Sequence, residues 1–241
     1  PDDDYSVSIF QQQAKSLINQ LNDNHVVPIL SGGTGLYVQS LLENYNFNDI
    51  KPNTKLRIEL DELYTEYGLD GLREYAQKLA EKGGIEIKYT DKHRLYRAIE
   101  LMTAGDYKSL IKQTKEGLSY KGPVIGLQRE RSDLYDRINR RVEIMFEKGL
   151  VDEVKQLLKS GVNPNCQAFK GIGYKEVVQY LEGLISYDAC VDLIQKNTRH
   201  FAKRQITWYK RMPYIEWITI DSQTTEAEIY GMACNIIDSR F

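Results

Sequence analysis

Positive charge is concentrated in one stretch near the C-terminus, RHFAKRQITWYKR at residues 199–211, which contains five Lys or Arg, one His and no acid. With helical spacing the cations share one face, and Phe201, Trp208 and Tyr209 lie on the opposite face, where we expect them to anchor the helix. A cationic face without acids repels itself unless a polyanion neutralises it, and nucleic-acid phosphate is the common polyanion. The pattern therefore indicates an RNA- or DNA-binding helix, with an ordinary solvated helix face as the alternative.

A second candidate is the glycine-rich stretch SGGTG at residues 31–35. Gly32 and Gly33 allow backbone N–H groups to converge on an anion, and a following helix would present its positive end. The hydroxyl of Thr34 adds a further donor. The stretch follows an apolar run, and ligands of α/β proteins bind at the carboxyl ends of strands. We expect a phosphate-binding turn, with a plain tight turn as the alternative.

Two arginines, Arg137 and Arg141, are spaced four residues apart in YDRINRRVE. On a helix they share a face, where two guanidinium groups can bind one diphosphate. The alternative is ordinary pairing within the helix with neighbouring acids, Asp133, Asp136 and Glu143.

Two further stretches combine cations with an aromatic residue. In HRLYR, residues 93–97, Arg94 and Arg97 project together and Tyr96 is placed to stack on a base; a plain surface helix is the alternative. In KGIGYKE, residues 170–176, two glycines permit close approach of the backbone between flanking cations. This composition suits RNA phosphate and base stacking, and a glycine turn at a helix start is the alternative.

The elements around these residues follow an α/β pattern. Residues 9–21 have helical spacing, the apolar run at 25–30 is typical of a buried parallel strand, and a helix follows the glycines. Residues 49–118 are polar and helical in period, and residues 121–128 again indicate a buried strand. The remaining chain is mostly helical. We therefore expect an α/β core interrupted by a helical insertion.

The composition limits the class of protein. The chain has 241 residues, a net charge of −2 and 41% hydrophobic residues, so it can bury a core and is not basic overall. Its three cysteines are far apart and indicate neither a zinc site nor a disulfide framework. No run of 18 apolar residues is present, and we expect a soluble, cytoplasmic protein without a membrane contact.

Taken in order, the motifs resemble those of the bacterial tRNA dimethylallyltransferase family, also called tRNA isopentenyltransferase. The resemblance extends over essentially the whole chain, and the last motif is especially specific. The motifs are GGTGLYVQSLL, DKHRLYRAIEL, LYDRINRRVEIMFEKGLVDEV, GIGYKE and TRHFAKRQITWYKR.

The resemblance implies an α/β fold with a P-loop NTPase-like parallel-sheet core, an inserted all-helical domain and a helical C-terminal part. The core would comprise residues 1–48 and 119–241, and residues 49–118 would bind the tRNA anticodon stem–loop. It also implies a reaction in which N6 of adenosine 37 attacks C1 of dimethylallyl diphosphate and expels diphosphate, with Mg²⁺ as the cofactor. The target base leaves its stack to react. A monomer is the family expectation.

The resemblance also assigns residues. Thr34 corresponds to a threonine at the reaction channel that contacts the substrate nucleotide, and Gly32 and Gly33 would bind diphosphate with it. Arg141, helped by Arg137, would bind the diphosphate leaving group. The implied tRNA-binding residues are Thr34, Arg57, His93, Arg94, Leu95, Tyr96, Arg97, Lys170, Gly171, Ile172, Gly173, Tyr174, Lys175, Lys203, Arg204, Gln205, Ile206, Thr207, Trp208, Tyr209 and Lys210.

Two motifs of the family are not found in these residues. There is no GxxxxGK[ST], whose Lys and Ser or Thr hold diphosphate and Mg²⁺, and no Asp-Ser-x-Gln-x-Tyr, whose aspartate is the general base. We therefore expect a chain that lacks about the first quarter of the family's length, with most Mg²⁺ ligands in that part, and that has no transferase activity alone. Two alternatives are an adenylate isopentenyltransferase, which would need neither the insertion nor the basic helix, and a non-catalytic RNA-binding module, which would need no diphosphate pocket.

Overall fold

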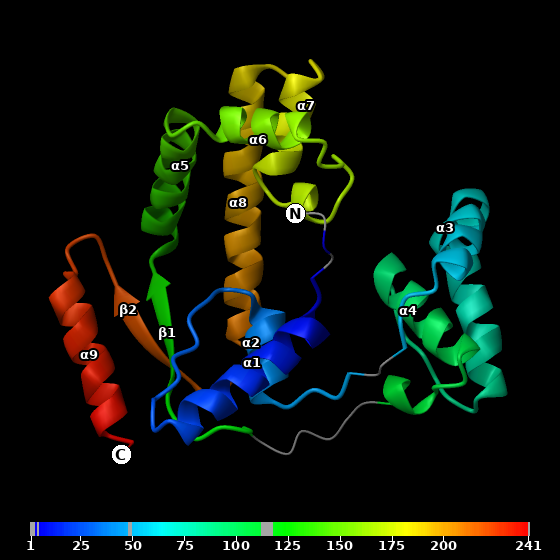
Figure 1. The fold of residues 1–241 in the computed structure, drawn as a ribbon, viewed down its shortest axis with the longest axis horizontal. Helices are drawn as coiled ribbons and strands as arrows, with labels where there is room; N and C mark the ends of the chain where they lie inside the picture. Colours follow the sequence, from blue (N-terminus) through cyan, green and yellow to red (C-terminus); the bar gives the residue numbers. More distant parts are fainter. Residues whose placement is uncertain (1–2, 4, 48–49, 112–117, 241) are drawn as a thin grey trace. The chain divides into compact units, whose positions relative to one another are not determined.

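The computed structural model describes residue 3 and residues 5–47, 50–111 and 118–240. Figure 1 shows the elements in chain order. They are α1 (Val7–Asp23), α2 (Gly35–Leu42), α3 (Thr54–Lys82), α4 (Lys92–Thr103), η1 (Lys108–Leu110), β1 (Val124–Arg129), α5 (Arg131–Glu147), α6 (Leu150–Lys159), η2 (Ala168–Lys170), α7 (Tyr174–Leu181), α8 (Tyr187–Tyr209), β2 (Ile215–Ile220) and α9 (Glu226–Asp238).

The chain forms two compact units. The sheet unit comprises Pro1–Leu42 and Leu118–Phe241, and the helical unit comprises Glu43–Gly117. The helical unit contains α3, α4 and η1, and its described residues include no strand. The boundary that the sequence predicts between residues 48 and 49 lies outside the described residues.

The helical unit has its own hydrophobic core between α3 and α4. Helix α3 begins after Asn53, whose side chain accepts a hydrogen bond of 3.1 Å from the amide of Leu56. Gly68 interrupts it with a φ of 64°, a backbone conformation that favours glycine. Apolar side chains at helical spacing fill the core: Leu56, Leu60, Leu72, Ala76, Ala80, Leu95, Ala98, Ile99 and Met102.

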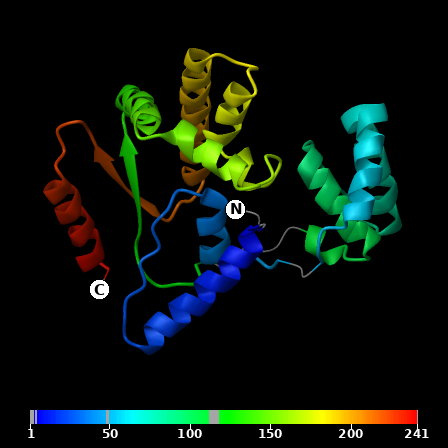
Figure 2. The ribbon, with the colours of Figure 1, turned by 45° about the horizontal axis from the view of Figure 1, so that its top comes forward.

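The sheet unit contains a parallel pair of strands, β1 and β2, with Val124 opposite Ile215 and Arg129 opposite Ile220. The strand predicted at residues 121–128 is confirmed as β1. Strand β2 was not predicted, although IEWITI is rich in β-branched and aromatic residues. Helices α5 to α8 connect the two strands, as a parallel pair requires a long crossover (Figure 2).

The strand predicted at residues 25–30 is wrong for this structure. The segment has no helix or strand assignment and exposes its apolar side chains, with Val27 82% and Ile29 89% exposed. A parallel strand needs a neighbouring strand for its backbone hydrogen bonds, and in the described chain β1 and β2 pair only with each other. The apolar character of the segment was identified correctly, but no partner strand covers it.

A second hydrophobic core lies among α5, α6, α7 and α8. Helix α8, the longest helix of the sheet unit, begins after Ser186, whose hydroxyl accepts a hydrogen bond from the amide of Ala189. The core side chains are Val142, Phe146, Leu150, Val154, Val162, Phe169, Val177, Cys190 and Ile194. This core holds α8 in place, and most predicted site residues of the sheet unit lie on α8 or on segments that contact it.

Candidate functional site

The glycine-rich turn at residues 31–35 lies against α8. Nε2 of Gln205 donates a hydrogen bond of 2.7 Å to the carbonyl of Gly33. A Cβ atom on Gly35 would lie 2.4 Å from Cδ1 of Trp208, and one on Gly33 would lie 2.7 Å from Nε2 of Gln205. Real Cβ atoms essentially never show such short distances, so the packing on α8 itself explains glycine at these two positions.

Thr34 is the exposed residue that immediately precedes α2. Its carbonyl accepts hydrogen bonds of 2.9 Å and 3.1 Å from the amides of Tyr37 and Val38, which confirms the helix predicted after the glycines. The first amides of α2 therefore lie close to Thr34 in sequence and space. Free N–H groups at a helix start favour a bound anion, so the turn has the local geometry of an anion-binding segment.

Two donors at the C-terminal end of α8 are buried without an acceptor. Nε1 of Trp208 and the hydroxyl of Tyr209 have no hydrogen-bond partner among the described residues. Burial also raises the pKa of Tyr209. An unsatisfied buried donor costs about 1–3 kcal/mol, so this end of α8 is not fully hydrogen-bonded in the present arrangement.

The cations of α8 divide into two groups. Lys203, Arg204 and Lys210 are exposed and have no ion pair in the described part of the chain. Arg199 instead donates a hydrogen bond of 2.5 Å to Oδ1 of Asn139 on α5, so it supports helix packing and is not part of the free cationic face. The expectation that Phe201 anchors the helix is also wrong: Phe201 is 40% exposed, and the guanidinium of Arg204 lies 5.7 Å from its ring centre.

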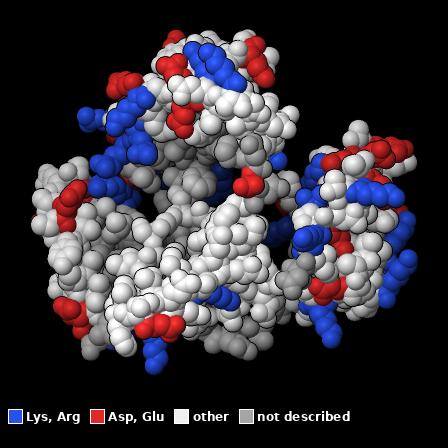
Figure 3. Space-filling model, in the orientation of Figure 1, with Lys and Arg blue, Asp and Glu red and all other residues white. Residues whose placement is uncertain are grey.

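Helix α5 presents a second group of free cations. Arg137 and Arg141 are exposed, and neither forms an ion pair with any described residue. Of the three neighbouring acids, Asp133 binds Arg129 at 2.8 Å, and Asp136 and Glu143 form no ion pair with a described residue. Figure 3 shows blue side chains gathered over α5. The alternative of pairing within the helix is therefore not found, and the two guanidinium groups are available to an anion.

Helix α8 contacts both the glycine-rich turn and helix α5. It packs against α2 and against α5. Its contact with α5 includes Gln195 and Arg199, which both bond to Asn139, and its contact with the turn begins at Gln205. The rise of an α-helix is 1.5 Å per residue, so Arg199 and Gln205 are about 9 Å apart along the axis. The turn and α5 thus both pack on α8.

The loop at residues 170–175 is tied to α8 through a buried carboxylate. Glu176, which is 1% exposed, accepts hydrogen bonds of 2.7 Å from the amide of Gly173 and 2.8 Å from Nδ2 of Asn197. Gly173 has a φ of 104°, where glycine is strongly favoured. The side chains of Lys170 and Lys175 are exposed. Nζ of Lys175 lies 3.4 Å from Oε1 of Glu176, whereas Lys170 has no ion pair with a described residue.

Aromatic and apolar residues of the same loop face inward. Phe169 packs edge to face on Tyr174, whose hydroxyl donates a hydrogen bond of 2.5 Å to Oε1 of Glu153. That hydrogen bond to a carboxylate raises the pKa of Tyr174. Gly171 and Ile172 complete the loop, and Ile172 packs against the core of α5 to α8. The hydroxyl of Tyr174 is thus engaged in a hydrogen bond within the protein.

In the helical unit, a buried carboxylate binds two of the predicted tRNA-binding arginines. Glu100 accepts hydrogen bonds of 2.7 Å and 3.2 Å from Nε and Nη2 of Arg57 and one of 3.3 Å from Nη1 of Arg97. The amide of Asn53 donates a fourth, at 3.0 Å. Burial opposes ionisation of Glu100, but the bonds from Arg57 and Asn53 outweigh it and hold its pKa below the ordinary value. The hydrogen bond to Glu100 raises the pKa of Arg57.

The stretch at residues 93–97 does not form one surface. His93 and Arg94 are exposed, but Leu95 and Tyr96 belong to the core, with Tyr96 6% exposed. The hydroxyl of Tyr96 donates a 2.8 Å hydrogen bond to Asp61. Burial leaves this ring no free face for a base, and Arg97 donates to Glu100 and, at 2.8 Å, to the carbonyl of Ile50. Within the stretch the exposed groups are His93 and Arg94.

Sequence reasoning missed the residues that position the others. Asn139, Glu176 and Glu100 were not predicted as site residues, because each has a partner far away in the sequence: Arg199, Asn197 and Arg57, respectively. Two contacts have a local signal: Arg97 and Glu100 are three residues apart on α4, which is the spacing of a helical ion pair, and Glu176 lies three residues after Gly173 at the start of α7.

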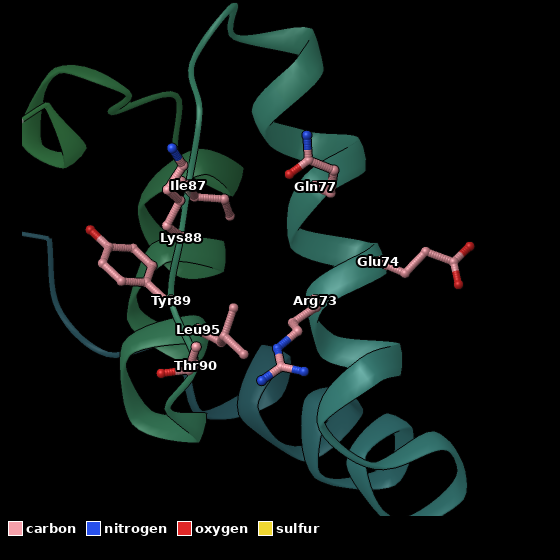
Figure 4. A pocket seen from close by; sticks show the side chains of 8 residues that line it. All are labelled: Arg73, Glu74, Gln77, Ile87, Lys88, Tyr89, Thr90 and Leu95. Atoms are coloured by element: carbon pink, nitrogen blue, oxygen red, sulfur yellow. The ribbon is translucent and has the colours of Figure 1, made fainter.

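A hollow of about 480 Å³ lies between α3 and the segment before α4 (Figure 4). It is lined by Arg73, Glu74, Gln77, Ile87, Lys88, Tyr89, Thr90 and Leu95. Its two cations already have partners, since Arg73 binds Asp70 and Lys88 binds Glu86. The hollow therefore does not have the free positive charge that a phosphate site needs.

Across the described residues, no group of three or more His, Cys, Asp or Glu side chains is placed to hold a metal ion. Within the same residues, none of the helices combines the length and apolar character required to cross a bilayer.

Comparison with known proteins gives one consistent result. A family model described as "IPP transferase" matches residues 1–212. A Clostridioides difficile protein named tRNA dimethylallyltransferase is 39% identical over 225 residues, which cover 92% of this chain and 71% of the relative. A Natranaerobius thermophilus protein of the same name is 36% identical over 238 residues, which cover 98% of this chain and 71% of the relative.

Solved structures with the same fold are also known. A tRNA isopentenylpyrophosphate transferase from Bacillus halodurans is 33% identical, with a TM-score of 0.66, covering 100% of this chain and 76% of that chain. A tRNA delta(2)-isopentenylpyrophosphate transferase from Staphylococcus epidermidis is 30% identical, with a TM-score of 0.68. The match covers 100% of this chain and 78% of that chain.

Proposed function

The chain belongs to the IPP transferase family, and we propose that the turn at residues 31–35, helix α5 and helix α8 form its reaction site. Its function is the transfer of a dimethylallyl group to tRNA, as in its relatives named tRNA dimethylallyltransferase. In the reaction that we propose, N6 of adenosine 37 attacks C1 of dimethylallyl diphosphate. The bond from C1 to the bridging oxygen breaks, its electron pair leaves with diphosphate, and N6 loses a proton.

The leaving group gains negative charge in the transition state, and fixed cations accelerate the reaction when they stabilise that charge. We assign this role to Arg141, with Arg137 beside it, because both are exposed on α5 and lack ion pairs among the described residues. Thr34 and the amides at the start of α2 would bind the diphosphate from the turn.

The tRNA would bind the exposed cations through its phosphates. On the sheet unit these are Lys203, Arg204 and Lys210 of α8 together with Lys170 and Lys175 of the loop. On the helical unit the exposed cation of the predicted set is Arg94, together with the ring of His93 and the outer edge of Arg57. Contacts of this kind position the RNA and make its affinity dependent on salt.

We also propose that the chain has a P-loop-type sheet core with an inserted helical domain, and that this domain binds the anticodon stem–loop. The parallel pair of β1 and β2 supports it, because parallel strands joined by helices are typical of α/β sheet cores. The helical unit supports it as well, because its described elements are helices with their own core.

Among the described residues no metal-ligating cluster is found, and we propose that the ligands of Mg²⁺ come mainly from the P-loop motif of the family. When bound, Mg²⁺ would neutralise diphosphate charge. Neither the family's P-loop lysine nor its general-base aspartate occurs in the sequence, and we propose that this 241-residue chain is inactive alone.

The observation that supports the site most directly is the packing of α8 on both the turn and α5. The test is to incubate the protein in its full natural chain with dimethylallyl diphosphate and either tRNA or free AMP, and to identify the product nucleoside by mass. Prenylated adenosine at tRNA position 37 is the expected result. Product on AMP alone would indicate an adenylate isopentenyltransferase, and tRNA binding without any product would indicate a non-catalytic RNA-binding protein.

A further inference from the structure

The C-terminal half of α8 has two faces with different contacts. At about 100° per residue, Lys203, Thr207 and Lys210 lie within about 60° of one another, and all three are exposed. Gln205 and Trp208 lie on the opposite side, where they contact Gly33 and Gly35. The same two helical turns therefore present cations outward and hold the glycine-rich turn inward.

We propose that Gln205 and Trp208 are positioning residues that couple tRNA binding to prenyl diphosphate binding. The proposal rests on the proposed function, in which RNA binds the outer face of α8 and diphosphate binds at Thr34. RNA that immobilises the end of α8 also immobilises the turn, because Gln205 is bonded to the carbonyl of Gly33 at 2.7 Å. Diphosphate then binds a turn that is already ordered, and its affinity rises.

A buried donor at this contact, Nε1 of Trp208, lacks an acceptor within the described structure. It would lie 2.9 Å from a Cβ on Gly35. A shift of the turn, or an oxygen atom of bound diphosphate, would give this N–H an acceptor. The arrangement with an acceptor is favoured, so the ligand and the helix end both affect the same contact.

The contact between the turn and α8 requires glycine at two positions, 33 and 35. Any side chain at Gly35 would collide with the indole of Trp208, and any at Gly33 would displace the amide of Gln205. A Cβ on Gly32, by contrast, would meet no described atom within 4 Å, so Gly32 takes no part in the contact. The coupling is therefore assigned to residues 33 and 35 and not to the turn as a whole.

The test measures the coupling directly in the full natural chain. The dissociation constant of a non-reacting thio analogue of dimethylallyl diphosphate is measured by calorimetry with and without saturating tRNA, and that of tRNA with and without the analogue. The two ratios must agree, because coupling is reciprocal. In the wild-type protein we expect tRNA to tighten analogue binding severalfold. Gln205→Met keeps the side-chain length but removes the donor, and we expect it to lower the ratio at least about 2-fold, towards a value of one, because the net contribution of one hydrogen bond is lost.

Gly35→Ala tests the other half of the contact and is expected to lower the ratio as well, because its Cβ displaces Trp208. Gln179→Met is the matched control, since Gln179 is exposed on α7 and its side chain has no hydrogen bond with a described residue. Thermal unfolding of each variant shows that it is folded.

An unchanged ratio in folded Gln205→Met and Gly35→Ala would overturn the coupling while leaving the proposed function intact. The same conclusion follows if the wild-type protein binds both ligands independently. If the wild-type protein binds neither ligand, the proposed function fails and the coupling fails with it.

Discussion

Glu100 and Arg57 form a two-pronged ion pair in which a side chain that is 1% exposed binds one that is 43% exposed. The pair joins α4 to the start of α3, where Glu100 also accepts the amide of Asn53. Arg57 therefore stabilises the helical unit and at the same time presents its outer edge to solvent. An arginine that is held in this way loses little side-chain freedom when it binds a phosphate.

The substitution Glu100→Gln should destabilise the helical unit. It removes the negative charge that Arg57 and Arg97 share, and breaking such a pair from its buried side leaves donors without an acceptor. We expect a loss of about 1–3 kcal/mol in the free energy of unfolding, measured by urea denaturation. Glu59→Gln on exposed α3 is the control and should change little. Equal stability of both variants would show that the pair contributes nothing.

The contribution of Glu100 to the free energy of unfolding should decrease as the pH falls into the acid range. Its pKa is lower in the folded protein than the ordinary value of 4.5, so the stabilisation is fully present above that pH and is lost as the pH falls through the folded-state pKa. The difference in unfolding free energy between the wild-type protein and Glu100→Gln should therefore be constant at neutral pH and shrink in acid. Denaturation series between pH 3 and 7 (about one pH unit apart) measure it. A difference that grows in acid would contradict the assignment.

Glu176→Gln should loosen the loop at residues 170–175. Glu176 accepts from the amide of Gly173 and from the side chain of Asn197, and a glutamine has only one oxygen for these two donors. We expect a loss of about 1–3 kcal/mol and faster hydrogen exchange at the Gly173 amide. Glu182→Gln, in an exposed position after α7, is the control. Unchanged exchange at Gly173 would show that the loop is held by other contacts.

Charge reversal on α8 should weaken tRNA binding and change its salt dependence. For Lys203→Glu and Arg204→Glu, we expect a lower affinity and a plot of log affinity against log salt that is shallower by about one for each lost phosphate contact. Filter binding at several salt concentrations measures both. Lys159→Glu on exposed α6 carries the same charge change away from the proposed RNA-binding face and is the control. If the three variants behave alike, net charge rather than this face determines binding.

Arg141→Gln should lower kcat and leave tRNA affinity unchanged in the full natural chain. Its guanidinium is free of ion pairs in the described structure and is proposed to stabilise charge on the departing diphosphate. Loss of one such group reduces the rate by about 10²- to 10³-fold. Single-turnover prenylation separates this step from binding. A variant with normal kcat and weakened tRNA binding would place Arg141 on the RNA surface instead.

Local pattern was enough to predict most helices. The helix expected at residues 9–21, the helix after GGTG and the strand before α5 are present, because periodicity and glycine placement are properties of neighbouring residues. Segment 25–30 shows the limit of this reasoning. Its composition is that of a strand, but a strand exists only where a second backbone satisfies its hydrogen bonds.

The exposure of the cations in the candidate site could be predicted from the sequence, but the contacts within the candidate site could not. Lys203, Arg204, Arg137 and Arg141 are exposed cations, as their spacing suggested. By contrast, a sequence read locally cannot show that Arg199 is bonded to Asn139, which is 60 residues away. The same holds for the partners of other buried polar groups, because tertiary packing determines which side chains meet.

The uncovered segment around Val27 and Ile29 has a practical consequence for handling the 241-residue chain. Extended backbone with water-facing branched side chains is a template for pairing between molecules, and such edges promote aggregation. Preparations of this chain should therefore self-associate as the concentration rises. Placing a lysine at position 27 or 29 should restore solubility, because natural proteins protect open edges with charge.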